Sequence, residues 1–142
     1  MKGSLIRLGL LLGLAAGSVG AANADSSPVG LWQMSTFSIP SGAATTVQTV
    51  CFNVDKTWYS TSQPNWNGSW FMNEKDFNWY GSFPYPQIGN VASMAMGKLD
   101  SPTTMTGRYA EWTAPGTPPL SVNWNLTYSM TFLQADCPPP RK

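Results

Sequence analysis

The sequence contains no histidine. This absence removes the usual general base at neutral pH, the serine and cysteine nucleophiles that a histidine activates, and the most frequent protein metal ligand. No glycine-rich loop opens a helix, so we expect no phosphate-binding loop either. The sequence therefore predicts no catalytic residue, no metal site and no cofactor, and we expect a protein that is not an enzyme.

One weak catalytic alternative remains. Glu74 and Asp76 lie among aromatic residues, and glycosidases use two carboxyl groups on either side of a sugar. However, the Glu-Lys-Asp sequence falls where we expect a hairpin turn, and charged residues at such a turn are normally solvated. We therefore predict that these two carboxylates belong to the turn.

Charge is also scarce. Only 11% of the residues are charged, against about 25% in a typical soluble domain. The formal net charge is +1, and it is close to zero when Lys2 and Arg7 of the expected leader are set aside. Such a balance gives no electrostatic footprint for nucleic acid or for an anionic membrane surface. Nucleic acid is therefore not an expected partner.

The first 24 residues are typical of a signal peptide. Lys2 and Arg7 precede the apolar run 8–16, and Ala22-Asn23-Ala24 is a small-x-small cleavage site. The apolar run is shorter than the roughly 20 residues that cross a bilayer, and no second candidate follows it, so we expect no membrane span in the mature chain. We therefore expect an exported protein, periplasmic or extracellular.

The chain has two cysteines, Cys51 and Cys137. In an oxidising compartment an isolated pair is best interpreted as one disulfide. This bond would close most of the mature domain into a loop. We divide the chain into the signal peptide 1–24, a single β domain 25–136 and an unstructured Pro-rich tail 137–142.

The clearest strand signal lies late in the chain, where apolar and polar residues alternate over 120–132. The apolar positions are Leu120, Val122, Trp124, Leu126, Tyr128, Met130 and Phe132. Weaker strand patterns cover 29–37, 46–54, 66–73, 76–83, 91–99 and 103–112, with a hairpin turn near 73–76. About seven strands and no helix predict an all-β domain, either a small antiparallel sandwich or an open barrel.

Aromatic residues are densest in the segment 65–85. Strand alternation predicts that Phe77, Trp79 and Phe83 point into the core. Trp66, Trp70 and Tyr80 are then predicted to share the outer face, where aromatic rings and nearby asparagines bind sugars or other rings. These three residues are the candidate ligand-binding site, for a carbohydrate or a small aromatic or apolar ligand.

Four segments together resemble a known family of small exported bacterial proteins, the domain of unknown function 3617. They are GLWQMSTFSIP (30–40), TVQTVCF (46–52), TTMTGRYAEW (103–112) and MTFLQADC (130–137). The resemblance implies an exported β domain without an assigned activity. Family members often carry further cysteines in the middle of the chain, where this sequence has its aromatic segment instead.

Two shorter resemblances imply a barrel. Gly30-Leu31-Trp32 is similar to the Gly-x-Trp opening of lipocalins, and NWNLTYSMTF (123–132) is similar to a strand of avidin. The first functional hypothesis is an exported, non-enzymatic β domain that binds a small ligand or a protein partner through a barrel mouth or a sheet face. The alternatives are a carbohydrate-binding module and a self-associating structural subunit of an extracellular or envelope assembly, joined through exposed strand edges.

Overall fold

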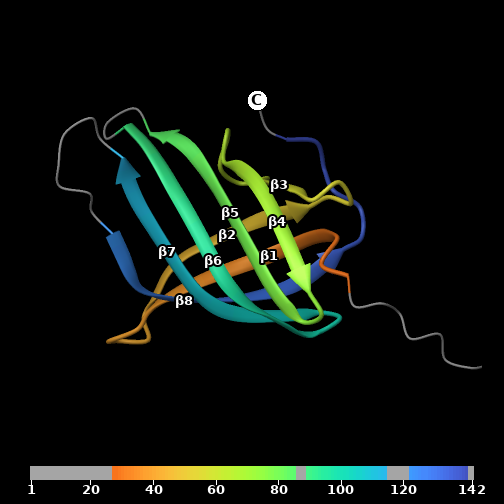
Figure 1. Ribbon diagram of the computed structural model, residues 1–142, viewed down its shortest axis with the longest axis horizontal. Helices are drawn as coiled ribbons and strands as arrows, with labels where there is room; N and C mark the ends of the chain where they lie inside the picture. The colour runs from red at the N-terminus through yellow and green to blue at the C-terminus, as the bar shows by residue number, and fades with distance from the viewer. Residues whose placement is uncertain (1–26, 86–88, 115–121, 141–142) are drawn as a thin grey trace, which may run out of the picture.

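The protein folds into one closed barrel of eight antiparallel strands (Figure 1). The computed structural model describes residues 27–85, 89–114 and 122–140, so the predicted signal peptide lies outside the described residues. The strands are β1 (Gly30–Ser38), β2 (Ala44–Phe52), β3 (Thr57–Ser60), β4 (Asn67–Asn73), β5 (Asp76–Tyr85), β6 (Gly89–Ser101), β7 (Thr104–Ala114) and β8 (Val122–Gln134). Within this described part, no helix is long and apolar enough to cross a membrane.

Each strand pairs with the next one along the chain, and β8 returns to pair with β1. This closure removes the two outer edges that an open sheet of these strands would have, as in up-and-down barrels. The predicted all-β antiparallel architecture is confirmed, and the barrel is closed. The strand that the sequence pattern missed is β3, which has only four residues and follows the turn 53–56.

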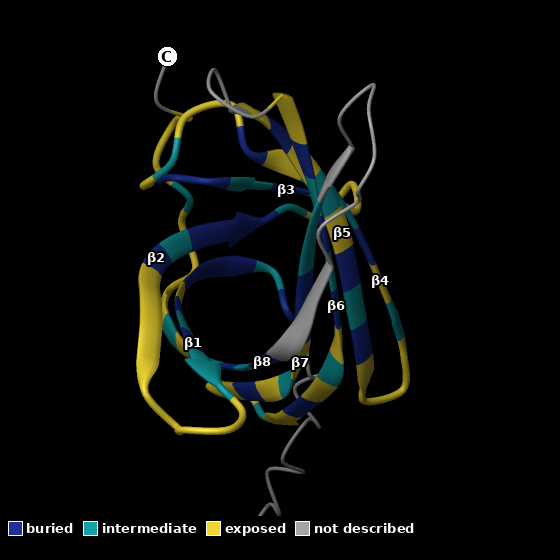
Figure 2. Ribbon diagram, turned by 90° about the vertical axis from the view of Figure 1, so that its left-hand side faces the viewer, coloured by how far each residue is buried: buried dark blue, intermediate teal, exposed yellow. Residues whose placement is uncertain are grey.

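Alternation of side chains separates the inside of the barrel from the outside. Along β5 and β6 buried and more exposed residues follow one another with a period of two (Figure 2). On β8, Leu126, Tyr128 and Met130 are buried as predicted. Of the residues predicted to precede them on this face, residue 120 and the side chains of residues 122 and 124 lie outside the described part of the structure.

Large rings fill the barrel because glycines on the neighbouring strands make room for them. Gly68 and Gly81 are cross-strand neighbours, and a Cβ added to either would collide with the ring of Trp58. Gly97 and Gly107 form a second cross-strand pair, on which the ring of Tyr128 lies in the same way. An eight-stranded barrel has an interior just wide enough for its side chains, so each glycine pair accommodates one ring.

The two ends of the barrel differ. The turns 53–56, 74–75 and 102–103 lie at one end, which we call the closed end. There the Trp70 indole N–H donates to the Asn53 carbonyl (3.1 Å), and the Lys56 ammonium lies 3.8 Å from the centre of the Trp70 ring. At the other end β1 finishes at Ser38 and β2 begins at Ala44. We call this end the mouth.

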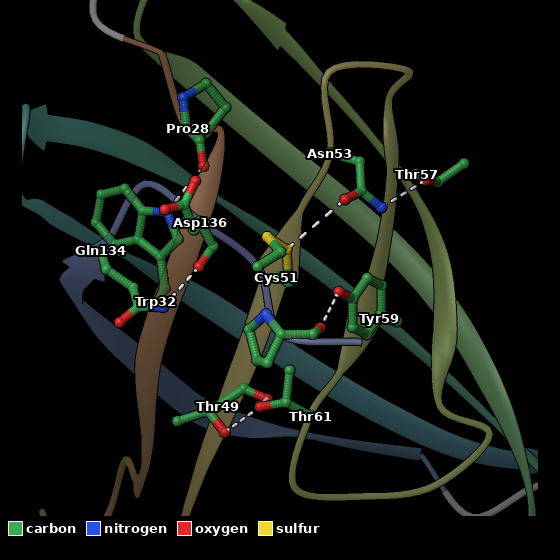
Figure 3. The surroundings of a disulfide bond; sticks show 12 residues. Pro28, Trp32, Thr49, Cys51, Asn53, Thr57, Tyr59, Thr61, Gln134 and Asp136 are labelled. Carbon is green, nitrogen blue, oxygen red and sulfur yellow. Dashed lines mark hydrogen bonds between the residues drawn. A yellow bond between two sulfur atoms is a disulfide. The ribbon is translucent and has the colours of Figure 1, made fainter. Parts of the chain in front are cut away.

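A disulfide between Cys51 on β2 and Cys137, which follows β8, holds the chain end against the barrel (Figure 3). The predicted bond is confirmed, and it joins residues 86 positions apart. Residues 137–140 form no strand or helix, but the tail is not free: the Tyr59 hydroxyl donates to the Pro138 carbonyl. The tail therefore lies along the outer side of β2 and β3.

We expect the double variant Cys51→Ser/Cys137→Ser to lose about 4–5 kcal/mol of unfolding free energy, because on the chain-entropy model a long disulfide loop removes that much from the unfolded ensemble. Urea unfolding of the variant and of the oxidised wild type measures the difference. Reduced wild type is the control and should match the variant. A difference below about 1 kcal/mol would contradict the expected constraint.

We expect Gly81→Ala to destabilise the barrel by about 1–3 kcal/mol, the usual range for an overpacked core, because its Cβ would meet the Asn67 carbonyl and the Trp58 ring. Where space allows, the same change stabilises a protein by about 0.4–1 kcal/mol through the unfolded state. The sign of the change, measured by urea denaturation, is therefore decisive. Ser82→Ala, at the exposed neighbouring position, is the control.

Candidate ligand-binding site at the barrel mouth

The structure divides the three residues predicted to form a surface platform. Tyr80 is 52% exposed, as expected for the outer face, but Trp66 and Trp70 are each only 3% exposed. Both tryptophans belong to the hydrophobic core. The predicted outward orientation of Trp66 and Trp70 is therefore wrong, and the three residues form no common surface.

The turn between β4 and β5 explains the error. Glu74 and Lys75 are the only residues between the paired Asn73 and Asp76, and Glu74 has a positive φ of 54°. A two-residue turn fixes the register of the hairpin, and this register sets Trp70 directly opposite Trp79. Cross-strand neighbours point to the same face, so Trp70 must point inward with Trp79.

The predicted inward residues are confirmed. Phe77 and Trp79 are fully buried, and Phe83 is 9% exposed. The predicted hairpin turn is confirmed as well, with Glu74 and Asp76 both exposed. In the part of the chain that the structure describes, no group of three or more His, Cys, Asp or Glu residues is placed to hold a metal ion.

A cavity of about 300 Å³ opens at the mouth. Its floor is apolar and its walls are polar. The lining residues are Thr36, Thr45, Thr46, Gln48, Gln63, Trp66, Phe83, Tyr109, Glu111 and Leu126. They come from β1, β2, the loop before β4, and β5, β7 and β8, so the cavity is a feature of the whole barrel end. Of the three residues predicted to bind a ligand, Trp66 lines this cavity, and Trp70 and Tyr80 do not.

The cavity exists at this end because β3 is short. Along β2 this strand pairs with three residues only, Val50, Cys51 and Phe52. The first half of β2, residues 44–49, therefore has β1 as a strand neighbour on one side and no strand on the other among the described elements. Residues 44–47 at the start of this half are exposed (Figure 2). Thr45, Thr46 and Gln48 of this half-strand line the cavity.

The floor is held in place by a hydrogen bond. The Trp66 indole N–H donates to the Ser93 hydroxyl over 3.1 Å, and the Trp66 ring packs 5.3 Å from Phe83, centre to centre. Ser93 is itself buried and lies opposite Glu111 on the neighbouring strand. A buried indole with its N–H satisfied keeps one orientation, so Trp66 presents a fixed apolar surface to the cavity.

Glu111 is the acidic residue of the cavity wall. The Tyr109 hydroxyl donates to its Oε1 over 2.6 Å. Burial, and then the neighbouring Glu111 charge, raise the pKa of Tyr109 well above its ordinary value. Tyr109 therefore keeps its proton at neutral pH and acts as a permanent donor that orients the carboxylate.

Gln48 lines the cavity and has a buried polar atom that lacks a hydrogen-bond partner within the described structure. It is only 6% exposed, and its side-chain oxygen is buried without a hydrogen-bond partner among the described residues. The other two such atoms in the described part of the chain, the Trp79 indole nitrogen and the Tyr128 hydroxyl, belong to the hydrophobic core. A buried unpaired amide costs about 1–3 kcal/mol, so Gln48 reduces stability where it stands.

The sequence carried a signal for both residues. Gln48 shares its strand face with Val50 and Phe52, and Glu111 shares its face with Tyr109, because each pair is separated by an even number of positions. A polar residue at an inward position of a strand is either an error of assignment or a functional group. The alternation of side chains along each strand could therefore have identified Gln48 and Glu111 as inward polar residues. It could not show that both line the same cavity.

We expect Trp66→Ala and Trp70→Ala each to lose about 3–5 kcal/mol of unfolding free energy, as for large rings removed from a core. Tyr80→Ala is the matched surface control and should change it by no more than about 0.5 kcal/mol. Urea denaturation with far-UV circular dichroism measures all three. If either tryptophan variant is as stable as Tyr80→Ala, the burial of that tryptophan in the core is contradicted.

Comparison with known proteins found no family model, no curated protein and no solved structure that matches the chain. The resemblance to the domain of unknown function 3617 therefore stays a prediction, and the candidate site rests on the geometry of the barrel mouth.

Proposed function

We propose that the protein is a small-molecule binding barrel whose site is the mouth cavity. In this proposal the apolar part of the ligand lies on Trp66, Phe83 and Leu126. Its polar part hydrogen-bonds to the Gln48 amide. The site is concave, mostly preformed and lined by an apolar floor with a few polar groups, as small-molecule sites usually are.

The buried Gln48 oxygen carries the proposal. Nearly all buried polar side-chain atoms in native proteins have a hydrogen-bond partner, and an exception calls for a reason. A partner supplied by a bound ligand is a sufficient reason for an amide that lines a cavity. The Trp79 indole nitrogen and the Tyr128 hydroxyl belong to neighbouring rings of the hydrophobic core and interact with each other, so they support no site.

The carbohydrate-platform hypothesis loses its main support, because Trp66 and Trp70 are core residues. We also propose that binding takes place outside the cytoplasm. The disulfide supports this location, since such bonds persist in oxidising compartments. The predicted signal peptide points the same way.

Titration with phenylethanol, followed by ¹H–¹⁵N NMR, tests the proposal. This compact neutral probe has one ring for the apolar floor and one hydroxyl for Gln48. Few non-hydrogen atoms limit its affinity, so we expect a dissociation constant on the order of millimolar. The Trp66 indole N–H and the Gln48 side-chain amide should shift, whereas the Trp70 indole N–H at the closed end should not.

The variant Gln48→Leu separates binding from stability. It should weaken phenylethanol binding by about threefold to tenfold, since one net hydrogen bond is worth about 0.5–1.5 kcal/mol, and it should raise the unfolding free energy by about 1 kcal/mol or more. Gln33→Leu, the same change at an exposed position of β1, should not weaken binding. Shifts confined to Trp70, or the absence of any saturable shift, would contradict the proposed function.

A further inference from the structure

We infer that the mouth cavity selects ligands in which a small apolar body carries an ammonium group, and that the carboxylate of Glu111 recognises this group. The inference rests on the proposed function and names the ligand class for the same site. It follows from the charges at the mouth, from the orientation of Glu111 and from the rings of the cavity floor.

The two ends of the barrel carry different charges. Acidic and basic residues are mixed on or near the closed end. They are Asp55, Lys56, Glu74, Lys75, Asp76, Lys98, Asp100 and Asp136. No lysine or arginine is among the described residues that line the mouth cavity. Arg108, on β7, is exposed and points away from the interior, opposite Met96 and Thr127.

Glu111 is thus the charged lining residue of the cavity, and it is negative. The segments 86–88 and 115–121, which connect β5 to β6 and β7 to β8, contain no charged residue in the sequence. A partly buried carboxylate attracts a cation more strongly than a fully solvated one, because the effective dielectric constant around it is lower. The same charge disfavours an anionic ligand.

The hydrogen bond from Tyr109 makes this carboxylate a prepared binding group. Because it holds Oε1 at 2.6 Å, Glu111 does not have to be ordered when a ligand arrives, and preorganisation of this kind increases affinity. Tyr109 donates its only hydroxyl proton in this bond, so it offers the ligand no donor that would repel an ammonium group. The hydroxyl groups of Thr36 and Thr45, which also line the cavity, are already hydrogen-bonded to one another over 2.7 Å.

The floor suits the rest of such a ligand. Trp66, Phe83 and Tyr109 present aromatic rings to the cavity, and ammonium groups are attracted to aromatic faces at short range. A contact of this kind is present at the closed end, where the Lys56 ammonium lies 3.8 Å from the centre of the Trp70 ring. An organic ammonium can therefore combine ring contact, the Glu111 charge and the Gln48 amide.

Three probes that differ in one group test the inference: phenylethylammonium, phenylethanol and phenylpropionate. Their dissociation constants are measured by NMR titration at neutral pH, with the Trp66 and Gln48 signals as reporters. We expect the ammonium to bind at least about tenfold more tightly than the alcohol, since hydrogen bonds to charged groups are worth about 1.5–3 kcal/mol. The carboxylate should bind most weakly.

Glu111→Gln keeps the shape of the side chain and an oxygen for the Tyr109 hydroxyl, but removes the charge. In this variant the dissociation constants of the alcohol and the ammonium should differ by no more than about twofold, so their ratio should be close to one. Glu74→Gln, the same change at the exposed closed-end turn, should leave that ratio unchanged.

The outcomes separate the two proposals. Equal affinity for the ammonium and the alcohol in the wild type, or a preference that survives Glu111→Gln, overturns the inference on ligand class. In either case binding of the alcohol at the Trp66 and Gln48 signals leaves the proposed function standing. If none of the three probes shifts those signals, the proposed function fails and the inference fails with it.

Discussion

The fit of large aromatic rings over paired glycines is the constraint on which the rest of this barrel depends. Trp58 lies over Gly68 and Gly81, and Tyr128 lies over Gly97 and Gly107. With any other residue at those glycine positions, the added Cβ atoms would collide with the rings. Without the rings the glycines would leave voids that a close-packed interior does not tolerate. A few bulky side chains thereby fill this part of the barrel, and a cavity opens at the mouth.

Strand alternation in the sequence predicted much of this core. It placed Phe77, Trp79 and Phe83 inside, because each strand face repeats every second residue and the apolar residues follow that period. It failed for Trp66 and Trp70, because alternation within one strand does not say how two strands are aligned. The two-residue turn at Glu74 and Lys75 decides that alignment, and a turn of that length was readable in the sequence.

Other features could not have been predicted from the local pattern. The closure of β8 on β1 and the side-by-side placement of the glycine pairs depend on contacts between residues far apart in the chain. The same is true of the mouth cavity, whose lining comes from several strands. The disulfide was predictable because only two cysteines exist. In contrast, the contact of the tail with Tyr59 depends on where that bond directs the chain.

The short β3 links the fold to the proposed site. A longer β3 would pair with the first half of β2 and cover Thr45, Thr46 and Gln48 with backbone hydrogen bonds and side chains. Because β3 ends at Ser60, these residues line an open cavity. The apolar floor that Trp66 forms and the buried amide of Gln48 then lie at the same end as Glu111. A polar, partly unsatisfied end above an aromatic core is unfavourable for stability alone, and sites that sacrifice stability are where function is expected. Binding at the mouth gives a physical reason why the chain keeps a glutamine at position 48, where leucine would be more stable.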